Sequence, residues 1–87
     1  MIVQAQFSIY PLKEQHLSPY IGKALEIIKK SGLDVEEGSM SSVVNGESAT
    51  IFKAFDEVIN ALGDKTHFVI TATISNACPV GVNKKIV

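Results

Sequence analysis

The sequence predicts an α+β domain in which two helices cover one face of a four-stranded antiparallel sheet. Two segments alternate apolar and polar residues with the period of two that a half-buried strand requires. Two others repeat apolar residues at helical spacing and are followed by glycines. At 87 residues, 46% of them hydrophobic, the chain has enough material for one small core. We therefore expect a single domain spanning residues 1–87.

The first predicted strand runs from Ile2 to Tyr10 and is ended by Pro11. One of its sides is apolar and the other polar, namely Val3, Ala5, Phe7 and Ile9 against Gln4, Gln6, Ser8 and Tyr10. The last predicted strand, His67 to Ser75, alternates in the same way, with Phe68, Ile70, Ala72 and Ile74 opposite Val69, Thr71, Thr73 and Ser75. Each of these strands has one face for the core and one that the core does not use.

The first predicted helix spans about Pro19 to Ser31, with Ser18 as its N-cap and Gly32 as its stop signal. Its apolar stripe consists of Ile21, Ala24, Leu25 and Ile28. The second helix begins at the cap residue Ser48 and ends at Gly63, and its stripe consists of Ile51, Phe55, Val58, Ile59 and Leu62. Both stripes are wide enough to pack a helix onto a sheet.

Two shorter strands lie between the helices, at Leu33 to about Met40 and at Ser41 to Glu47. The element order is then strand, helix, strand, strand, helix, strand, which is the ferredoxin-like pattern. Right-handed crossovers place the first and third strands in the middle and both helices on one face. The opposite face of the sheet is left uncovered.

Charge and composition exclude several classes of function. All 8 basic residues are lysines, and the net charge is -1, so no concentrated basic face for duplex nucleic acid is expected. An acylphosphatase-type phosphate cradle would need arginine, and an RNA-recognition module would need more aromatics than Tyr10 on the open face. A single cysteine and the lack of a membrane-length apolar run favour a reduced, cytoplasmic protein.

The predicted open face is polar but almost uncharged. Amides and hydroxyls offer both donors and acceptors, which suits a neutral heteroaromatic with ring nitrogens and an amino group. The same face is also compatible with simple solvation or with packing against a second subunit. Because so small a chain leaves a whole sheet face bare, self-association into a homodimer or homotetramer is favoured.

The opening strand, with Ala5, Gln6, Ser8, Tyr10, Pro11 and Leu12, resembles that of the small thiamine-binding, YkoF-like proteins. Further pieces agree in the same order: Ser18 with Tyr20, Lys23-Ala24-Leu25, Ser31-Gly32-Leu33, Gly38 with Met40, Gly46-Glu47 and Lys84-Lys85. The resemblance implies a ferredoxin-like fold in dimers or tetramers. It also implies binding of thiamine or its hydroxymethylpyrimidine moiety where sheets meet, without catalysis.

By position, the resemblance assigns ligand contacts to Gln6, Ser8, Tyr10, Met40 and Ser41. Geometry alone adds the open-face residues of the last strand, Thr71, Thr73 and Ser75. Glu36 is a further candidate, because its carboxylate can accept a hydrogen bond from an aminopyrimidine or balance a thiazolium cation. The alternative is a structural or regulatory interaction module in which subunit packing uses the whole face.

The residues that most often carry metal or covalent chemistry form no constellation here. His16, His67 and Cys78 have no metal-ligand spacing, so neither a metal nor a cofactor is expected. Cys78 precedes Pro79 and is interpreted as a partly buried small apolar residue rather than a nucleophile.

Overall fold

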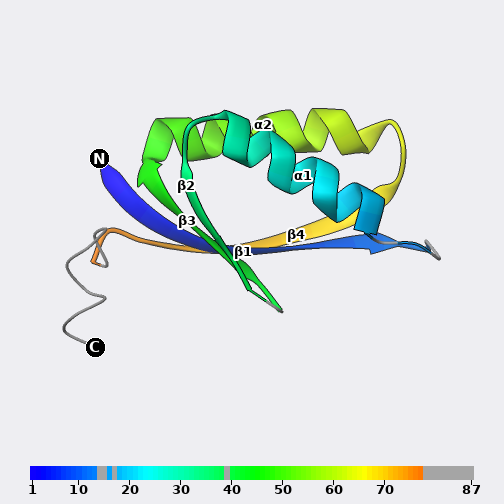
Figure 1. Cartoon of the computed structure of the whole chain (residues 1–87), viewed down its shortest axis with the longest axis horizontal. Helices are drawn as coiled ribbons and strands as arrows, with labels where there is room; N and C mark the ends of the chain where they lie inside the picture. Colours follow the sequence, from blue (N-terminus) through cyan, green and yellow to red (C-terminus); the bar gives the residue numbers. More distant parts are fainter. Residues whose placement is uncertain (14–15, 17, 39, 78–87) are drawn as a thin grey trace.

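The protein is a four-stranded antiparallel sheet with two helices on one of its faces (Figure 1). The computed structural model describes residues 1–13, 16, 18–38 and 40–77. The elements are β1 (Ile2–Leu12), α1 (Ser18–Lys30), β2 (Asp34–Glu37), β3 (Ser42–Glu47), α2 (Ser48–Gly63) and β4 (His67–Ser75). The strand order is β2-β3-β1-β4, so the predicted ferredoxin-like topology is confirmed.

The core lies between the sheet and the helices. On β1, the side chains of Val3, Ala5 and Phe7 are buried, as the alternation predicts. The helices contribute fully buried side chains to the same layer, including Ile28, Ile51 and Val58. The ring of Phe7 meets that of Phe55 edge to face, with 5.5 Å between centroids, which is a favoured aromatic geometry.

Strand β1 is longer than predicted, because Pro11 does not end it. Pro11 lies opposite Phe68 of β4, and the β3 register on the other side of β1 stops at Phe7. Proline lacks an N–H and is tolerated where a strand has a neighbour on one side only. The prediction was wrong because it treated the whole of β1 as a central strand.

Strand β2 is shorter than predicted and contains four residues, Asp34–Glu37, rather than a run to Met40. Gly38 marks the exit: a Cβ at this position would collide with the backbone carbonyl of Ser41. The chain therefore turns tightly straight after Glu37. Strand β3 begins at Ser42, one residue later than predicted.

The start of α2 also differs from the prediction. Its N-cap is Glu47 in an extended conformation, without a side-chain capping bond, and Ser48 is already helical. The backbone N–H of Ser48 donates to the carbonyl of Met1 at 2.9 Å, and the Glu47 carboxylate binds the Met1 ammonium at 2.7 Å. The chain terminus thus ties down the strand-to-helix junction that a serine cap was expected to hold.

The apolar stripe of α2 was predicted only in part. Ala54 is fully buried, although the prediction omitted it, and Ile59 is 47% exposed, although the prediction placed it in the core. Phe52 is 56% exposed on the same flank of the helix as Ile59, because residues seven apart are aligned along a helix. Helix α1 runs one residue earlier than predicted at each end, and Gly32, at a φ of 82°, turns the chain out of it.

Candidate ligand-binding site

The open face presents the polar side chains that the alternation predicts. Cross-strand partners share a face in a sheet, and the register aligns Thr73, Gln6, Val43 and Glu36 in one row across β4, β1, β3 and β2. Adjacent rows align Ser75 with Gln4 and Asn45, and Thr71 with Ser8. Gln6, Ser8 and Thr73 therefore lie together, opposite the helical layer.

Several of these polar groups bond to one another. The Gln4 amide donates to Asn45 Oδ1 at 3.1 Å, and the Gln6 amide donates to Ser41 Oγ at 2.9 Å. Ser8 Oγ donates to the backbone carbonyl of Met40 at 3.1 Å. These bonds join β1 to the β2–β3 connection and hold Met40 and Ser41 against the sheet.

A gap in the sheet lies beside the second half of β1. Strand β3 pairs with β1 only as far as Phe7, whereas β4 pairs with it as far as Leu12. From Ser8 onward, the described part of the chain supplies no strand on the β3 side of β1. Backbone N–H and C=O groups along such an unpaired edge are available to a ligand.

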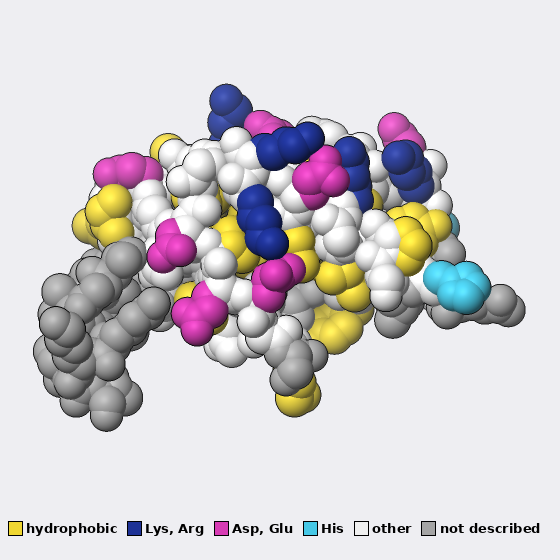
Figure 2. All heavy atoms as spheres, in the orientation of Figure 1, with side chains coloured by type: hydrophobic (Ala, Val, Ile, Leu, Met, Phe, Trp, Pro, Cys, Tyr) yellow, Lys and Arg dark blue, Asp and Glu magenta, His cyan; other side chains and the backbone are white. Residues whose placement is uncertain are grey.

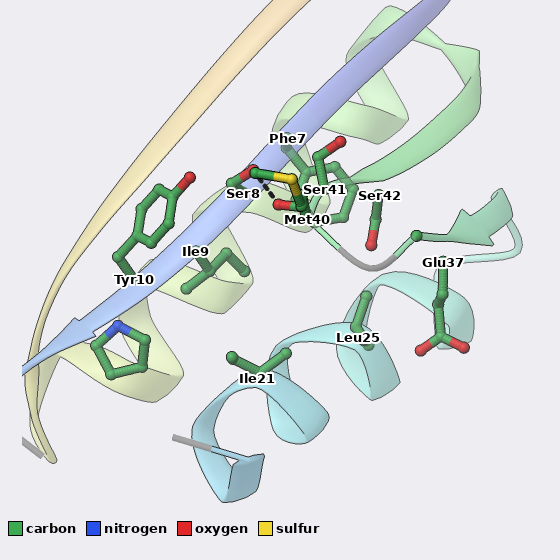
Figure 3. A pocket seen from close by; sticks show the side chains of 12 residues that line it. Phe7, Ser8, Ile9, Tyr10, Ile21, Leu25, Glu37, Met40, Ser41 and Ser42 are labelled. Carbon is green, nitrogen blue, oxygen red and sulfur yellow. Dashed lines mark hydrogen bonds between the residues drawn. The ribbon is translucent and has the colours of Figure 1, made fainter. Parts of the chain in front are cut away.

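A cavity of about 470 Å³ occupies this gap, within the usual range for small-molecule sites. Its walls come from β1 (Phe7–Pro11), from α1 (Ile21 and Leu25), and from Glu37, Gly38 and residues 40–42 around the β2–β3 connection. In Figure 3, Ile21 and Leu25 point from α1 across the cavity toward Ile9 on β1. The two apolar walls form a slot suited to a flat ring.

Polar groups line the rim of this slot. Ser8, Ser41 and Ser42 contribute hydroxyls, and Tyr10, half-exposed, lies on the opposite side from Glu37 in Figure 3. Met40 is 87% exposed and extends over Ser8. An apolar slot with a few polar groups at its edge is the usual design of a site that binds a heteroaromatic.

Among the described residues of the cavity wall, Glu37 is the charged one. Its carboxylate pairs with the Lys29 ammonium at 3.2 Å, and both side chains are about half exposed. A partly solvated pair of this kind is weak and is open to exchange with another cation. Figure 2 shows charged side chains spread over the helical layer, with hydrophobic side chains exposed beneath it.

A second cluster of charge lies on α1, away from the cavity. Glu26 pairs with Lys30 at 2.9 Å and with Lys23 at 4.0 Å. The hydrogen bond from Lys30 holds the pKa of the Glu26 carboxyl below its ordinary value. This cluster stabilises a solvated helix face and takes no part in the cavity.

The structure divides the predicted site residues into two groups. Ser8, Tyr10, Met40 and Ser41 line the cavity. The others face the same side of the sheet outside the cavity wall, namely Gln6, Glu36, Thr71, Thr73 and Ser75. Among these, Ser75 Oγ accepts a bond from the Ala77 N–H at 2.9 Å at the end of β4.

Sequence reasoning missed the helix-facing half of the cavity. Phe7, Ile9, Ile21 and Leu25 were assigned to the core, and Glu37 was passed over in favour of its neighbour Glu36. The available signal was the length mismatch between strands, because a long β1 beside a short β3 must leave part of β1 unpaired. Gly38, which ends β2 early, was a further signal of the same mismatch.

No group of three or more metal-binding side chains converges in the part of the chain that the structure describes. The described residue His67 begins β4 and is exposed, and His16 is exposed as well. Cys78 and the segment that follows it lie outside the described residues, so their predicted placement is not tested. Over the described ranges, no helix has both the length and the apolar character that a membrane crossing needs.

Comparison with known proteins places this geometry in a family. Residues 2–81 match the profile of the YKOF-related family, which is nearly the whole chain. The chain belongs to the YkoF-related family. The resemblance read from the opening strand is thereby confirmed.

Relatives of this YkoF-related protein share its architecture. The crystal structure of the hypothetical protein MJ1052 from Methanocaldococcus jannaschii superposes with a TM-score of 0.81 at 34% identity, covering 98% of this chain and 92% of that one. The sequence alignment with the same protein, UPF0045 protein MJ1052, extends over 56 residues that are 45% identical. It covers 63% of this chain and 56% of the relative, so the aligned part spans little more than half of the relative's length. A Thermotoga maritima protein with a suggested role in thiamine biosynthesis or salvage superposes with a TM-score of 0.83 at 25% identity, covering 99% of this chain and 96% of that one.

The tight turn at Gly38 gives a direct test of the cavity wall. Gly38→Ala places a methyl group against the Ser41 carbonyl, so the β2–β3 connection must shift, at an expected cost of about 1–3 kcal/mol. We expect a lower melting temperature by circular dichroism and loss of the ordered position of Met40 and Ser41. Gly22→Ala, in the middle of α1 with nothing near the added methyl, is the matched control and should stabilise by about 0.5–1 kcal/mol. Equal effects of the two variants would contradict a constrained turn.

Proposed function

We propose that this YkoF-related protein binds thiamine, or its hydroxymethylpyrimidine moiety, in the cavity beside β1 and performs no catalysis. The observation that carries the proposal is the slot itself, with apolar walls on two sides and an unpaired strand edge between them. The suggested thiamine role of the Thermotoga maritima relative supports the choice of ligand.

The chemistry of an aminopyrimidine matches the groups around the slot. Its ring is flat, and its amino group beside a ring nitrogen offers one donor next to one acceptor. An unpaired strand edge offers the complementary N–H and C=O groups, as in the pairing of one strand with another. The ring then lies between Ile9 on β1 and the α1 residues Ile21 and Leu25.

The lining favours binding over reaction. Its serines are weak nucleophiles unless a base activates them, and the described lining includes no histidine, lysine or cysteine. The Ser8 hydroxyl is committed to the Met40 carbonyl, which fixes the loop. These hydroxyls therefore serve as hydrogen-bonding groups in the proposal.

In the proposal, the other predicted contact residues reach the ligand only in an oligomer. These residues are Gln6, Glu36, Thr71, Thr73 and Ser75. A second subunit packed on the open face in a homodimer or homotetramer would cover the rim of the cavity and bring these residues near the ligand. The proposal places the protein in the cytoplasm.

One observation favours a second function, an interaction module without a ligand. The bonds Gln4–Asn45 and Gln6–Ser41 satisfy polar groups of the open face within the chain. A face that is already satisfied can be buried by a partner with little desolvation cost. In that case, subunit packing would use the whole face.

Thermal melting with thiamine, hydroxymethylpyrimidine and an unrelated purine separates the two functions. A ligand at 100 times its dissociation constant should stabilise the protein by about 2.7 kcal/mol. We expect Ser8→Phe to fill the cavity and remove the shift while the far-UV spectrum stays unchanged. Thr73→Phe, on the same face outside the cavity, tests the open-face contacts and should reduce the shift less than Ser8→Phe does. Asn60→Phe, at an exposed position of α2 outside the cavity and the open face, is the control and should keep the shift.

The pattern of loss identifies the site. A shift lost only in Thr73→Phe would move the ligand from the cavity to the flat open face. No shift with either pyrimidine in the wild-type protein would favour the interaction module.

Glu37 should distinguish the cationic vitamin from its neutral fragment. Thiamine carries a thiazolium cation that can replace Lys29 beside the carboxylate, whereas hydroxymethylpyrimidine is neutral. We expect Glu37→Gln to weaken thiamine binding about two- to fivefold in calorimetry and to leave the neutral pyrimidine unaffected. Glu57→Gln, on α2 and outside the cavity and the open face, is the control. An equal loss for both ligands would rule out charge recognition by Glu37.

A further inference from the structure

A polar hollow lies between the two helices, apart from the cavity beside β1. Its volume is about 330 Å³, and its lining comes from the end of α1 and the first part of α2. The lining residues are Lys30, Ser31, Thr50, Lys53 and Glu57. None of them lines the cavity, so ligands of the two sites would contact different side chains.

The α2 wall of the hollow carries two opposite charges that do not pair. Lys53 and Glu57 are four residues apart, yet neither forms an ion pair in the part of the chain that the structure describes. The other lysines of the two helices, Lys23, Lys29 and Lys30, each have a carboxylate partner. A lysine that precedes a glutamate by four residues is in the less favourable order for a helical ion pair. A cation and an anion thus line the same hollow without neutralising each other.

The rest of the lining adds hydrogen-bond donors and acceptors. The Lys30 ammonium donates to Glu26 at 2.9 Å, and because an ammonium has three donors, it keeps others for a ligand. Ser31 Oγ donates its hydrogen to the carbonyl of Ile27 at 3.2 Å, which leaves the oxygen as an acceptor. The Thr50 hydroxyl makes no hydrogen bond within the described ranges, so it can donate or accept. The hollow can therefore match a ligand that carries both an acid and an amine.

We propose that this hollow binds a small zwitterion, a molecule with a carboxylate at one end and an ammonium at the other. The carboxylate of the ligand pairs with the ammonium groups of Lys53 and Lys30. The ammonium of the ligand pairs with the carboxylate of Glu57. Binding of this kind gives each unpaired charge of the α2 wall a counter-ion.

The spacing along α2 sets the length of the ligand. Residues four apart on a helix are separated by about 6 Å along its axis, because the rise is about 1.5 Å per residue. A carboxylate and an ammonium joined by a short carbon chain can therefore contact Lys53 and Glu57 at the same time. A ligand with one charge leaves the other charged group of the wall without a counter-ion. Each contact is partly solvated and weak, so we expect a dissociation constant in the millimolar range.

A titration of the full chain with 4-aminobutyrate, butyrate and butylamine tests the charge matching through amide chemical shifts. The three compounds share a four-carbon chain and differ in whether they carry both charges, the acid alone or the amine alone. We expect saturable changes at Lys30, at Ser31 and at residues 50–57, with 4-aminobutyrate binding about two- to fivefold more tightly than either of the others. Butyrate or butylamine binding as tightly as 4-aminobutyrate would overturn the proposal, and so would the lack of a saturable change at these amides.

Two variants test the two halves of the hollow. Lys53→Met removes the partner of the acid and Glu57→Gln the partner of the amine, so each should weaken 4-aminobutyrate about two- to fivefold. Lys65→Met, beyond the end of α2 and outside the hollow, is the matched control and should keep the wild-type affinity. Unchanged affinity in Lys53→Met and Glu57→Gln, or an equal loss in Lys65→Met, would overturn the proposal. Neither variant alters a residue of the cavity, so the thermal shift with hydroxymethylpyrimidine should persist in both, and failure here leaves the proposed function to its own test.

Discussion

The mismatch in length between β1 and β3 is the constraint on which the functional geometry depends. Strand β1 has 11 residues, and β3 has 6. Because the β3 register ends at Phe7, the rest of β1 keeps β4 on one side and has no described strand on the other. The cavity occupies the space that a longer β3 would fill. The same mismatch explains why Pro11 can lie within a strand of the sheet.

The sequence predicted the parts of the fold that depend on periodicity. Alternation in β1 and β4 placed Gln6, Ser8, Thr71 and Thr73 on the open face, and the register confirms each of them. Two helical stripes and their glycines placed both helices to within one residue. These features are local, because the side-chain period alone decides which face is buried.

The cavity could not be predicted in the same way, because it forms between elements that are distant in the sequence. Ile21 and Leu25 have the pattern of ordinary core residues, and only their position beside the unpaired part of β1 makes them a cavity wall. The end of β2 was misplaced because the prediction carried the strand past Gly38 to Met40, whereas it ends at Glu37. A Cβ at position 38 would collide with the Ser41 carbonyl, and this close approach exists only once the turn is folded.

The central claim is that a thiamine-related pyrimidine occupies the slot between β1 and α1. The most direct test is to titrate the isotope-labelled protein with hydroxymethylpyrimidine and to follow the chemical shifts of its backbone amides. The account predicts that the largest changes fall on Ser8 to Tyr10, on Ile21 to Leu25 and on Met40 to Ser42. Changes confined to the Thr71–Ser75 side of the sheet, or no saturable change at any amide, would contradict it.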